Sequence, residues 1–333
     1  MPILPWTVSG SVPDIVTAQN VPTSFRITGL PSGVTYNRYT GQLSGKPVRT
    51  GSYTVKISAS NLAGTSPTIS TTIPVSALPD AGIGTFHGLV DRHLSMSQDF
   101  LGGMFRLSTS ATGAASGTLT FGARTWRFRG RLDAVEGIDP TARILVSRGR
   151  TLPALTFSIT INKTSGAVTG TITDGIDTVP ATGVRNAWHS RNHPATDFAG
   201  QYTALLTPPA ILDSDPVYPK GHGYGIITIA TSGAVRWAGR MADGGSVVHT
   251  TIMDAAGLFP LQRLLNRSLG SAQGWISIHL DGASAFADND VGGDVSWFKK
   301  PETSASARNY RDGFPDHTLA ALGSRWLRPA SGD

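Results

Sequence analysis

The chain has 333 residues, including 39 glycines, 21 prolines and no cysteine, and its formal net charge is +6 at pH 7. The absence of cysteine excludes disulfides, cysteine-ligated zinc and cysteine catalysis. No stretch is long and apolar enough for a membrane-spanning helix, and no run of lysine or arginine is typical of a nucleic-acid-binding arm. We therefore expect neither a membrane span nor a nucleic-acid partner, and interpret the basic excess as ordinary solvation.

The two ends of the sequence predict that it belongs to a larger protein. It begins MPILPWTVSG, which lacks the basic and apolar regions of a secretory signal peptide. The last segment, residues 308–333, looks like the start of a further unit. We expect an extracellular or cell-surface bacterial protein whose export signal lies outside this chain.

Residues 24–75 contain short strands separated by turn clusters. The stretches GLPSGV and TGQLSGKP provide the glycines and prolines that tight turns require. Between turns, Tyr53, Val55 and Ile57 alternate with polar residues, which is typical of a half-buried strand. Several short strands at regular turn spacing predict a β-sandwich.

This segment resembles the Ig-like domain family of the He_PIG type, found in bacterial surface and secreted proteins. The matching residues are Gly29-Leu30-Pro31, Gly33-Val34, Thr40-Gly41, Leu43-Ser44-Gly45, Pro47, Gly51-Ser52-Tyr53, Ala59-Ser60-Asn61 and Gly64. The resemblance covers about residues 1–78 and implies a spacer or adhesion module without a catalytic site. SALPDAG at 76–82 is the predicted linker.

The remainder, residues 79–333, alternates between apolar and polar residues in longer strands. Two half-repeats are visible, at about 84–187 and 197–300, followed by a C-terminal segment expected to return to a first strand. Each half-repeat opens with Gly-x-Phe/Tyr, at 84–86 and 200–202. The pentapeptide TSGAV occurs at 164–168 and again at 231–235, and we interpret both copies as the turn of a repeated hairpin unit. The stretch GTLTFGARTWRFRGRLD also aligns with GIITIATSGAVRWAGRMAD, which places Trp126 and Trp237 in near-equivalent positions. Because edge strands must be protected, we predict an all-β chain in which the Ig-like sandwich precedes a larger antiparallel β-barrel, or two facing sheets.

Two further comparisons bear on this second region. An outer-membrane barrel is disfavoured, because outward positions carry Arg127, Arg129, Arg131 and Lys163 and no aromatic girdles are evident. The region also resembles a β-barrel module from the C-terminal parts of secreted bacterial multidomain proteins. That resemblance depends on KGHGYGIITIATSGAVRWAGRMADG, FPLQRLLN, GSAQGWISI and DVSWFKKP, and it implies no established activity.

Candidate chemistry is concentrated in the connector between the half-repeats. We find no nucleophile elbow, His-Glu-x-x-His motif or phosphate loop. His189, His193 and Asp197 can hold a metal or support acid–base work, or can simply be polar connector residues. Trp188 is the tryptophan most expected to be exposed, where it can stack on a sugar.

Two other groups of residues are candidates for ligand binding. Arg127, Arg129 and Arg131 lie on one strand face and can follow an acidic glycan, or can form a solvated outer face. Asp288, Asp290 and Asp294 lie in an Asp/Asn/Gly-rich loop whose oxygens suit Ca²⁺, although the spacing is not that of an EF-hand and an ordinary loop accounts for it. Apart from that Ca²⁺, we expect no cofactor.

Three functions remain open from the sequence. The favoured one is a non-enzymatic extracellular binding, adhesion or spacer module, with polysaccharide, other cell-surface components and neighbouring domains of the same polypeptide as partners. The second is a carbohydrate-binding module that presents Trp188 or the arginine face. The third is a hydrolase or lyase at the barrel rim that uses His189, His193 and Asp197.

Overall fold

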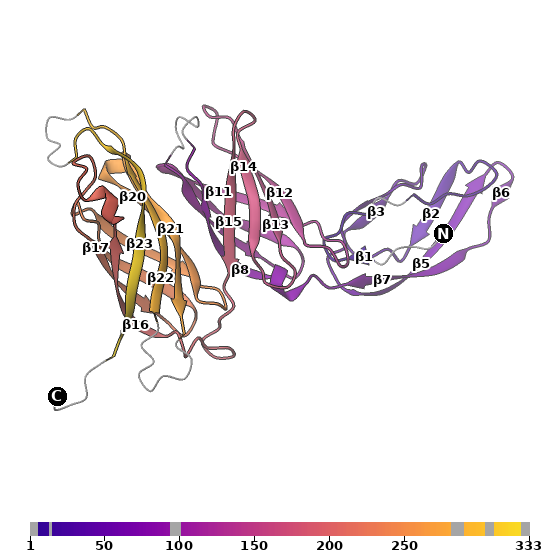
Figure 1. Ribbon diagram of the computed structural model, residues 1–333. Coiled ribbons are helices and arrows are strands. Elements are labelled where there is room, and N and C mark those ends of the chain that lie inside the picture. The colour runs from indigo at the N-terminus through magenta and orange to yellow at the C-terminus, as the bar shows by residue number, and fades with distance from the viewer. Residues whose placement is uncertain (1–5, 13–14, 94–100, 281–289, 304–309, 328–333) are drawn as a thin grey trace.

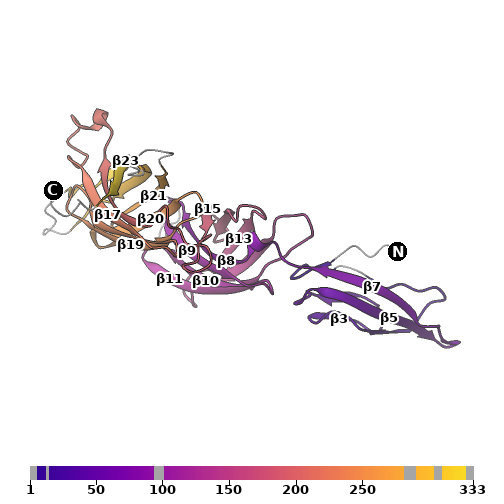
Figure 2. The ribbon, with the colours of Figure 1, turned by 90° about the horizontal axis from the view of Figure 1, so that it is seen from below.

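The computed structural model describes residues 6–12, 15–93, 101–280, 290–303 and 310–327. Within these ranges, strands and three short 3₁₀ helices are the regular elements. Figures 1 and 2 show three bodies in series: an N-terminal domain, a first barrel beside it and a second barrel beyond. The fold is therefore all-β, as predicted.

The N-terminal domain has the expected Ig-like organisation. Its strands are β1 (Trp6–Thr7), β2 (Ser24–Thr28), β3 (Val34–Tyr36), β4 (Leu43–Gly45), β5 (Gly51–Asn61), β6 (Gly64–Thr65) and β7 (Ile69–Ser76). One sheet has the order β1-β7-β5-β2, with β6 on β5, and β3 pairs with β4. Val55 and Ile73 are buried in its core. The alternation around Val55 thus correctly predicted a half-buried strand.

The first barrel follows the short helix η1 (Asp80–Gly82). Its strands are β8 (Gly84–Val90), β9 (Gly103–Thr109), β10 (Ala114–Phe121), β11 (Arg124–Arg131), β12 (Thr141–Val146), β13 (Leu155–Ile161), β14 (Val168–Thr173) and β15 (Thr178–Arg185). They form one sheet of order β11-β10-β9-β8-β15-β14-β13-β12. Inward positions of β13 illustrate the core, since Leu155, Phe157, Ile159 and Ile161 alternate with half-buried residues.

The second barrel repeats this topology strand for strand. Its strands are β16 (Gly200–Thr207), β17 (Gly223–Ile229), β18 (Ala234–Arg240), β19 (Ser246–Ile252), β20 (Leu258–Leu265), β21 (Gly270–His279), β22 (Asp290–Lys299) and β23 (Phe314–Trp326), with η2 (Ala210–Leu212) and η3 (Asn266–Ser268) in connections. The order is β19-β18-β17-β16-β23-β22-β21-β20. The C-terminal segment returns to the first strand of the second barrel, because β23 pairs with β16.

The region after the Ig-like domain thus forms two nearly closed eight-stranded sheets, and the second includes β23, which lies beyond the half-repeat at 197–300. The first residues of the two barrels match as the sequence indicated, because Phe86 and Tyr202 are both fully buried near the start of β8 and β16. A second repeated feature escaped the sequence comparison. Arg185 Nε donates to the Ile83 carbonyl at 2.8 Å, and Arg325 Nη1 donates to the Asp197 carbonyl at 3.3 Å. In each barrel the last strand is therefore tied to the segment that precedes the first strand.

The repeated pentapeptide does not mark equivalent hairpins, which corrects one inference from the sequence. The first copy connects β13 to β14, whereas the second connects β17 to β18. Gly166 and Gly233 both adopt left-handed conformations, with φ of 74° and 76°. The pentapeptide therefore encodes a local turn that is used at two unlike places, and Trp126 in β11 is not the counterpart of Trp237 in β18.

The turn at 230–234, which contains most of the second pentapeptide, has its true counterpart at residues 110–114. Ser110 N–H donates to Ala114 O at 3.0 Å and Gly113 N–H donates to Ser110 O at 2.8 Å. In the second barrel, Ala230 makes the same two contacts with Ala234 and Gly233, each at 2.9 Å. These two turns lie at the same end of each barrel and receive the segment from the preceding domain.

Candidate binding site between the two barrels

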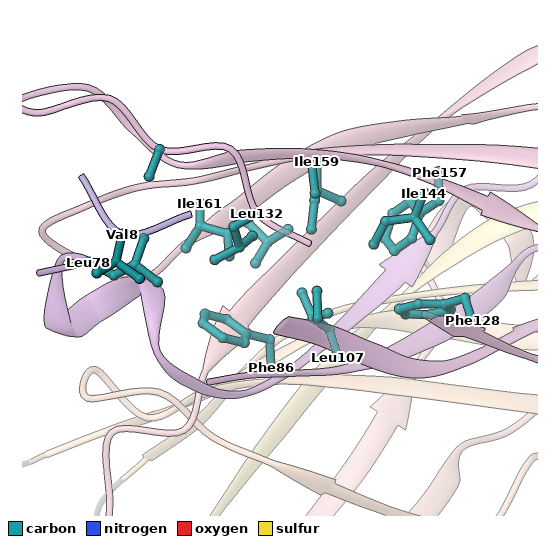
Figure 3. Packing of buried hydrophobic residues seen from close by; sticks show 14 of the residues in the cluster. Val8, Leu78, Phe86, Leu107, Phe128, Leu132, Ile144, Phe157, Ile159 and Ile161 are labelled. Atoms are coloured by element: carbon teal, nitrogen blue, oxygen red, sulfur yellow. The ribbon is translucent and has the colours of Figure 1, made fainter. Parts of the chain in front are cut away.

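The N-terminal domain is joined to the first barrel by a continuous apolar core. Figure 3 shows Val8 and Leu78 beside Ile161, Leu132 and Phe86 of the barrel. All five are buried. Because this end of the barrel is filled by side chains from outside it, the two domains cannot separate without exposing apolar surface to water.

Polar contacts fix the orientation of the same joint. Ser9 Oγ donates to the Leu132 carbonyl, and Lys46 Nζ lies 3.2 Å from an Asp133 carboxylate oxygen. Ser11 donates to that carboxylate through its N–H at 2.9 Å and its hydroxyl at 2.7 Å. A side chain at Gly113 would collide with Ser9, since an added Cβ would lie 2.2 Å from the Ser9 Cβ.

The connector between the barrels fills the second barrel in the same way. Trp188 is half-buried, and its indole N–H donates to the Asp254 carbonyl at 2.8 Å. Its ring stacks on His193 at 4.8 Å between centroids and packs edge-on against Phe198 at 5.6 Å. Asn186 Nδ2 donates to the Ser232 carbonyl at 3.1 Å, on the turn that corresponds to residues 110–114.

The predicted cluster of His189, His193 and Asp197 lies in this connector. The backbones of the two histidines pair with each other, at 2.8 and 3.0 Å. His193 Nδ1 is 2.9 Å from the Ala187 carbonyl, and His189 Nδ1 accepts from the backbone N–H of Arg191 at 3.3 Å. These contacts support the turn that positions Trp188.

The barrels are held side by side by an arginine from the first barrel. Arg92, just after β8, places its guanidinium on the outer wall of the second barrel across β21, β22 and β23. Its Nε and Nη2 donate to the hydroxyl and carbonyl of Ser271 at 2.9 and 2.7 Å. Nη2 also donates to the Ser296 carbonyl at 2.9 Å, and Nη1 donates to the Ser296 hydroxyl and, at 2.9 Å, to Asp316.

Strand β8 is consequently buried on both faces. His87 points away from the interior of its own barrel, and its Nδ1 lies 3.1 Å from Thr251 Oγ1 of the second barrel. Burial lowers the His87 pKa to about 3, with a further lowering from the positive charge of Arg106. His87 is therefore neutral at physiological pH and belongs to the interface.

Beside this interface the barrels enclose a cleft of about 380 Å³. The first barrel contributes Met104, Arg106, Thr118, Thr120 and Thr125, and the second contributes His249, Gln262, Arg263 and Leu264. The charged residues in this lining are arginines. Arg106 Nη2 donates to the Thr250 carbonyl at 2.9 Å, which fixes one arginine across the gap.

The pKa of His249 reflects the positive charge of the cleft. Burial lowers its pKa to about 4, and the charges of Arg106 and Arg263 lower it further, while a hydrogen bond to the Pro260 carbonyl opposes the shift. Nε2 of His249 and Nε2 of Gln262 are buried without a hydrogen-bond partner. The cleft thus carries a positive potential, which suits a bound anion, and its lining also holds two buried polar atoms without a partner.

The predicted arginine face adjoins this cleft. Arg127, Arg129 and Arg131 are exposed on β11, as the alternation indicated. Thr118 of β10 pairs with Arg106 on one side and with Arg127 on the other, so these three residues form a row on the outer wall. Arg131 is partly engaged, because its Nη2 donates to the Thr112 carbonyl at 2.7 Å.

The predicted calcium loop falls largely outside the described ranges. Asp288 lies there, whereas Asp290 and Asp294 are exposed at either side of a glycine pair in β22. Among the residues that the structure describes, no group of three or more His, Asp or Glu side chains is arranged to hold a metal ion.

Sequence reasoning did not identify the cleft. Arg106 and Arg263 are separated by more than 150 positions and lie in strands of different barrels. In the sequence, each of these two arginines is simply a polar residue at an outward position of an alternating strand. The one available signal was Gln262 beside Arg263 in an otherwise apolar stretch, FPLQRLL, where a polar residue at a buried position requires a partner.

Comparison with known proteins supports the first domain. Residues 5–76 match the He_PIG family, described as Putative Ig domain. The He_PIG segment coincides with the domain built by β1 to β7, so the resemblance drawn from its turn residues is confirmed. An Ig-like domain is compatible with an extracellular role. In the described part of the chain, no helix has the length and hydrophobicity to cross a membrane.

The remaining comparisons concern the chain as a whole. No curated protein matches the chain. One similar solved structure is a protein of unknown function from the DUF3598 family of Nostoc punctiforme PCC 73102, at 9% identity and a TM-score of 0.21. It covers 74% of this chain and 97% of that one. A TM-score this low supports no conclusion about fold or function.

Proposed function

We propose that this chain is a non-enzymatic binding and spacer module of a larger extracellular or cell-surface protein. The observation that carries the proposal is the joint that occurs twice. Val8 and Leu78 fill the end of the first barrel, and Trp188 with Phe198 fills the corresponding end of the second. The first joint shares one apolar core between two domains, and the second combines the connector's apolar contacts with the polar contacts of Arg92, so both restrict reorientation, as a spacer requires.

The rigidity can be tested by small-angle X-ray scattering. We expect one extended arrangement to fit the wild-type profile, and a Trp188→Ala variant to require a broader set of arrangements, because it removes the ring between His193 and Phe198. The matched control is Trp326→Ala, whose side chain is about half exposed in β23. A wild-type profile that itself requires freely reorienting domains would contradict the proposal.

Polysaccharide binding is the second candidate, favoured by the exposed arginine face of Arg127, Arg129 and Arg131. A glycan array with acidic and neutral polysaccharides tests it. We expect hits restricted to acidic chains, and their loss when the three arginines are replaced by glutamine together. An array without hits would leave only the spacer role.

The non-enzymatic assignment has its own test. We expect no cleavage products when the chain is incubated with the polysaccharides of the array. The contacts of His189 and His193 with backbone atoms of their own turn support this expectation. Cleavage that disappears in the His189→Ala, His193→Ala double variant would establish an enzyme instead.

A further inference from the structure

We infer that the cleft between the two barrels is a binding site for the anionic group of an acidic saccharide. The inference deepens the binding role proposed above and rests on it. It assigns the ligand to a site that only the packing of the barrels creates. The ligand group is an oxyanion, either a uronate carboxylate or a sulfate ester, carried on a hydroxyl-bearing ring.

Two arginine side chains give the cleft a positive charge that favours an anionic ligand. Arg106 and Arg263 are both exposed and face the same space from different barrels. Neither forms an ion pair with any acidic residue that the structure describes, whereas Arg92 does so with Asp316. Guanidinium groups bind carboxylates and sulfates through paired, charge-assisted hydrogen bonds, so two of them facing one cleft provide an anion site.

The neutral polar groups favour a sugar over a bare inorganic ion. Gln262 is only 7% exposed, and its Nε2 has no partner. His249 uses its ring to bond the Pro260 carbonyl and leaves Nε2 unpartnered. In the neutral ring, Nε2 is then an acceptor, which an inorganic sulfate or a carboxylate cannot satisfy but a sugar hydroxyl can. The Gln262 amide and the hydroxyls of Thr118 and Thr120 add donors and acceptors.

The size and position of the cleft agree with this ligand. A volume of about 380 Å³ suits one or two sugar rings, at the lower end of ordinary ligand sites. Arg127 continues the row of Arg106 and Thr118 along the outer wall. A chain bound at the cleft can therefore extend over the arginine face, so that one charged residue is held between the barrels and its neighbours are held more loosely.

Isothermal titration calorimetry with three probes tests the assignment. These are tetragalacturonate, its fully methyl-esterified form and a sulfated tetrasaccharide of heparin type. We expect the full chain to bind at least one of the charged probes, and not the ester. Arg263→Ala should weaken that binding about tenfold or more, since a hydrogen bond to a charged group is lost. Arg106→Ala should do likewise.

Controls separate the cleft from general charge. Arg26→Ala removes the same charge from an exposed strand of the Ig-like domain and should leave the affinity within twofold. Arg263→Ala is the cleaner cleft variant, because Arg106 also bonds the Thr250 carbonyl between the barrels. Gln262→Leu, which keeps the site buried, should also weaken binding, and thermal unfolding of each variant verifies that it is folded.

The outcomes are distinct. Preference for tetragalacturonate identifies a carboxylate site, and preference for the heparin-type probe identifies a sulfate site. Binding that is unaffected by Arg263→Ala and Arg106→Ala overturns the cleft assignment but leaves the polysaccharide-binding role in place. Equal binding of the methyl ester overturns the anion requirement. An absence of binding to all three probes overturns the inference, while the spacer role still stands on scattering data.

Discussion

Replacement of Arg92 by alanine is the most direct test of how the barrels are joined. The side chain is 11% exposed and contacts Ser271, Ser296 and Asp316 on three adjacent strands. Alanine removes the guanidinium that makes these contacts, while the second barrel keeps its own sheet and the contacts of His87 and Arg106 remain. We therefore expect the interface to weaken without loss of either fold.

The magnitude follows from the burial of each partner. Asp316 is 53% exposed, so its ion pair with Arg92 contributes about 1 kcal/mol or less. The bonds to Ser271 and Ser296 are buried and charge-assisted, at about 1.5–3 kcal/mol each when taken singly. They share one side chain and do not add, so we expect Arg92→Ala to cost about 2–4 kcal/mol in total.

Urea unfolding followed by tryptophan fluorescence measures this cost in the first transition, because unfolding either barrel breaks the interface. Asp316→Ala should cost no more than about 1 kcal/mol, and Arg92→Lys should fall between, since lysine keeps the charge without the planar fork. The exposed Arg26→Ala serves as the baseline. The reasoning is refuted if Arg92→Ala matches Arg26→Ala, or if Asp316→Ala costs as much as Arg92→Ala.

Two further predictions concern the joint formed by the connector on the second barrel and the interface histidine His87. Gly233→Ala should lower the free energy of unfolding by about 2–4 kcal/mol, because φ is +76° and the new Cβ would lie 2.6 Å from Asn186 and Trp188. The control Gly244→Ala has φ of +84° but open space around the new Cβ, and should lower it by only about 1 kcal/mol, as measured by thermal unfolding. The urea midpoint should fall as pH drops below 6.5, because the unfolded His87 ring protonates near pH 6.5 and the folded ring only near pH 3. Stability from the neutral ring is thus complete above pH 6.5, and a His87→Gln variant should show a flatter profile between pH 4 and 7.

Local features of the chain were predictable. The strand around Val55 and the left-handed glycines of both TSGAV turns follow from alternation and turn chemistry. These are short-range properties, because a two-residue period and a positive φ are set by neighbouring residues.

The equivalence of hairpins was not predictable from the pentapeptide. A turn sequence specifies the backbone of four or five residues and carries no information about which strands flank it. Hence TSGAV recurs at β13–β14 and β17–β18, while the equivalent turn at residues 110–114 has a different sequence. Only the strand order shows which turn receives the preceding domain.

In the candidate site, too, some features were predictable from the sequence and others depend on the tertiary structure. The outward direction of Arg127, Arg129 and Arg131 was determined by the sequence, because successive residues of a strand alternate between faces. The partners of Arg92, the burial of His87 and the meeting of Arg106 with Arg263 were decided by tertiary structure. An outward residue is solvated or buried according to what packs against its barrel, and that packing joins segments more than a hundred residues apart, beyond the range of any periodic pattern.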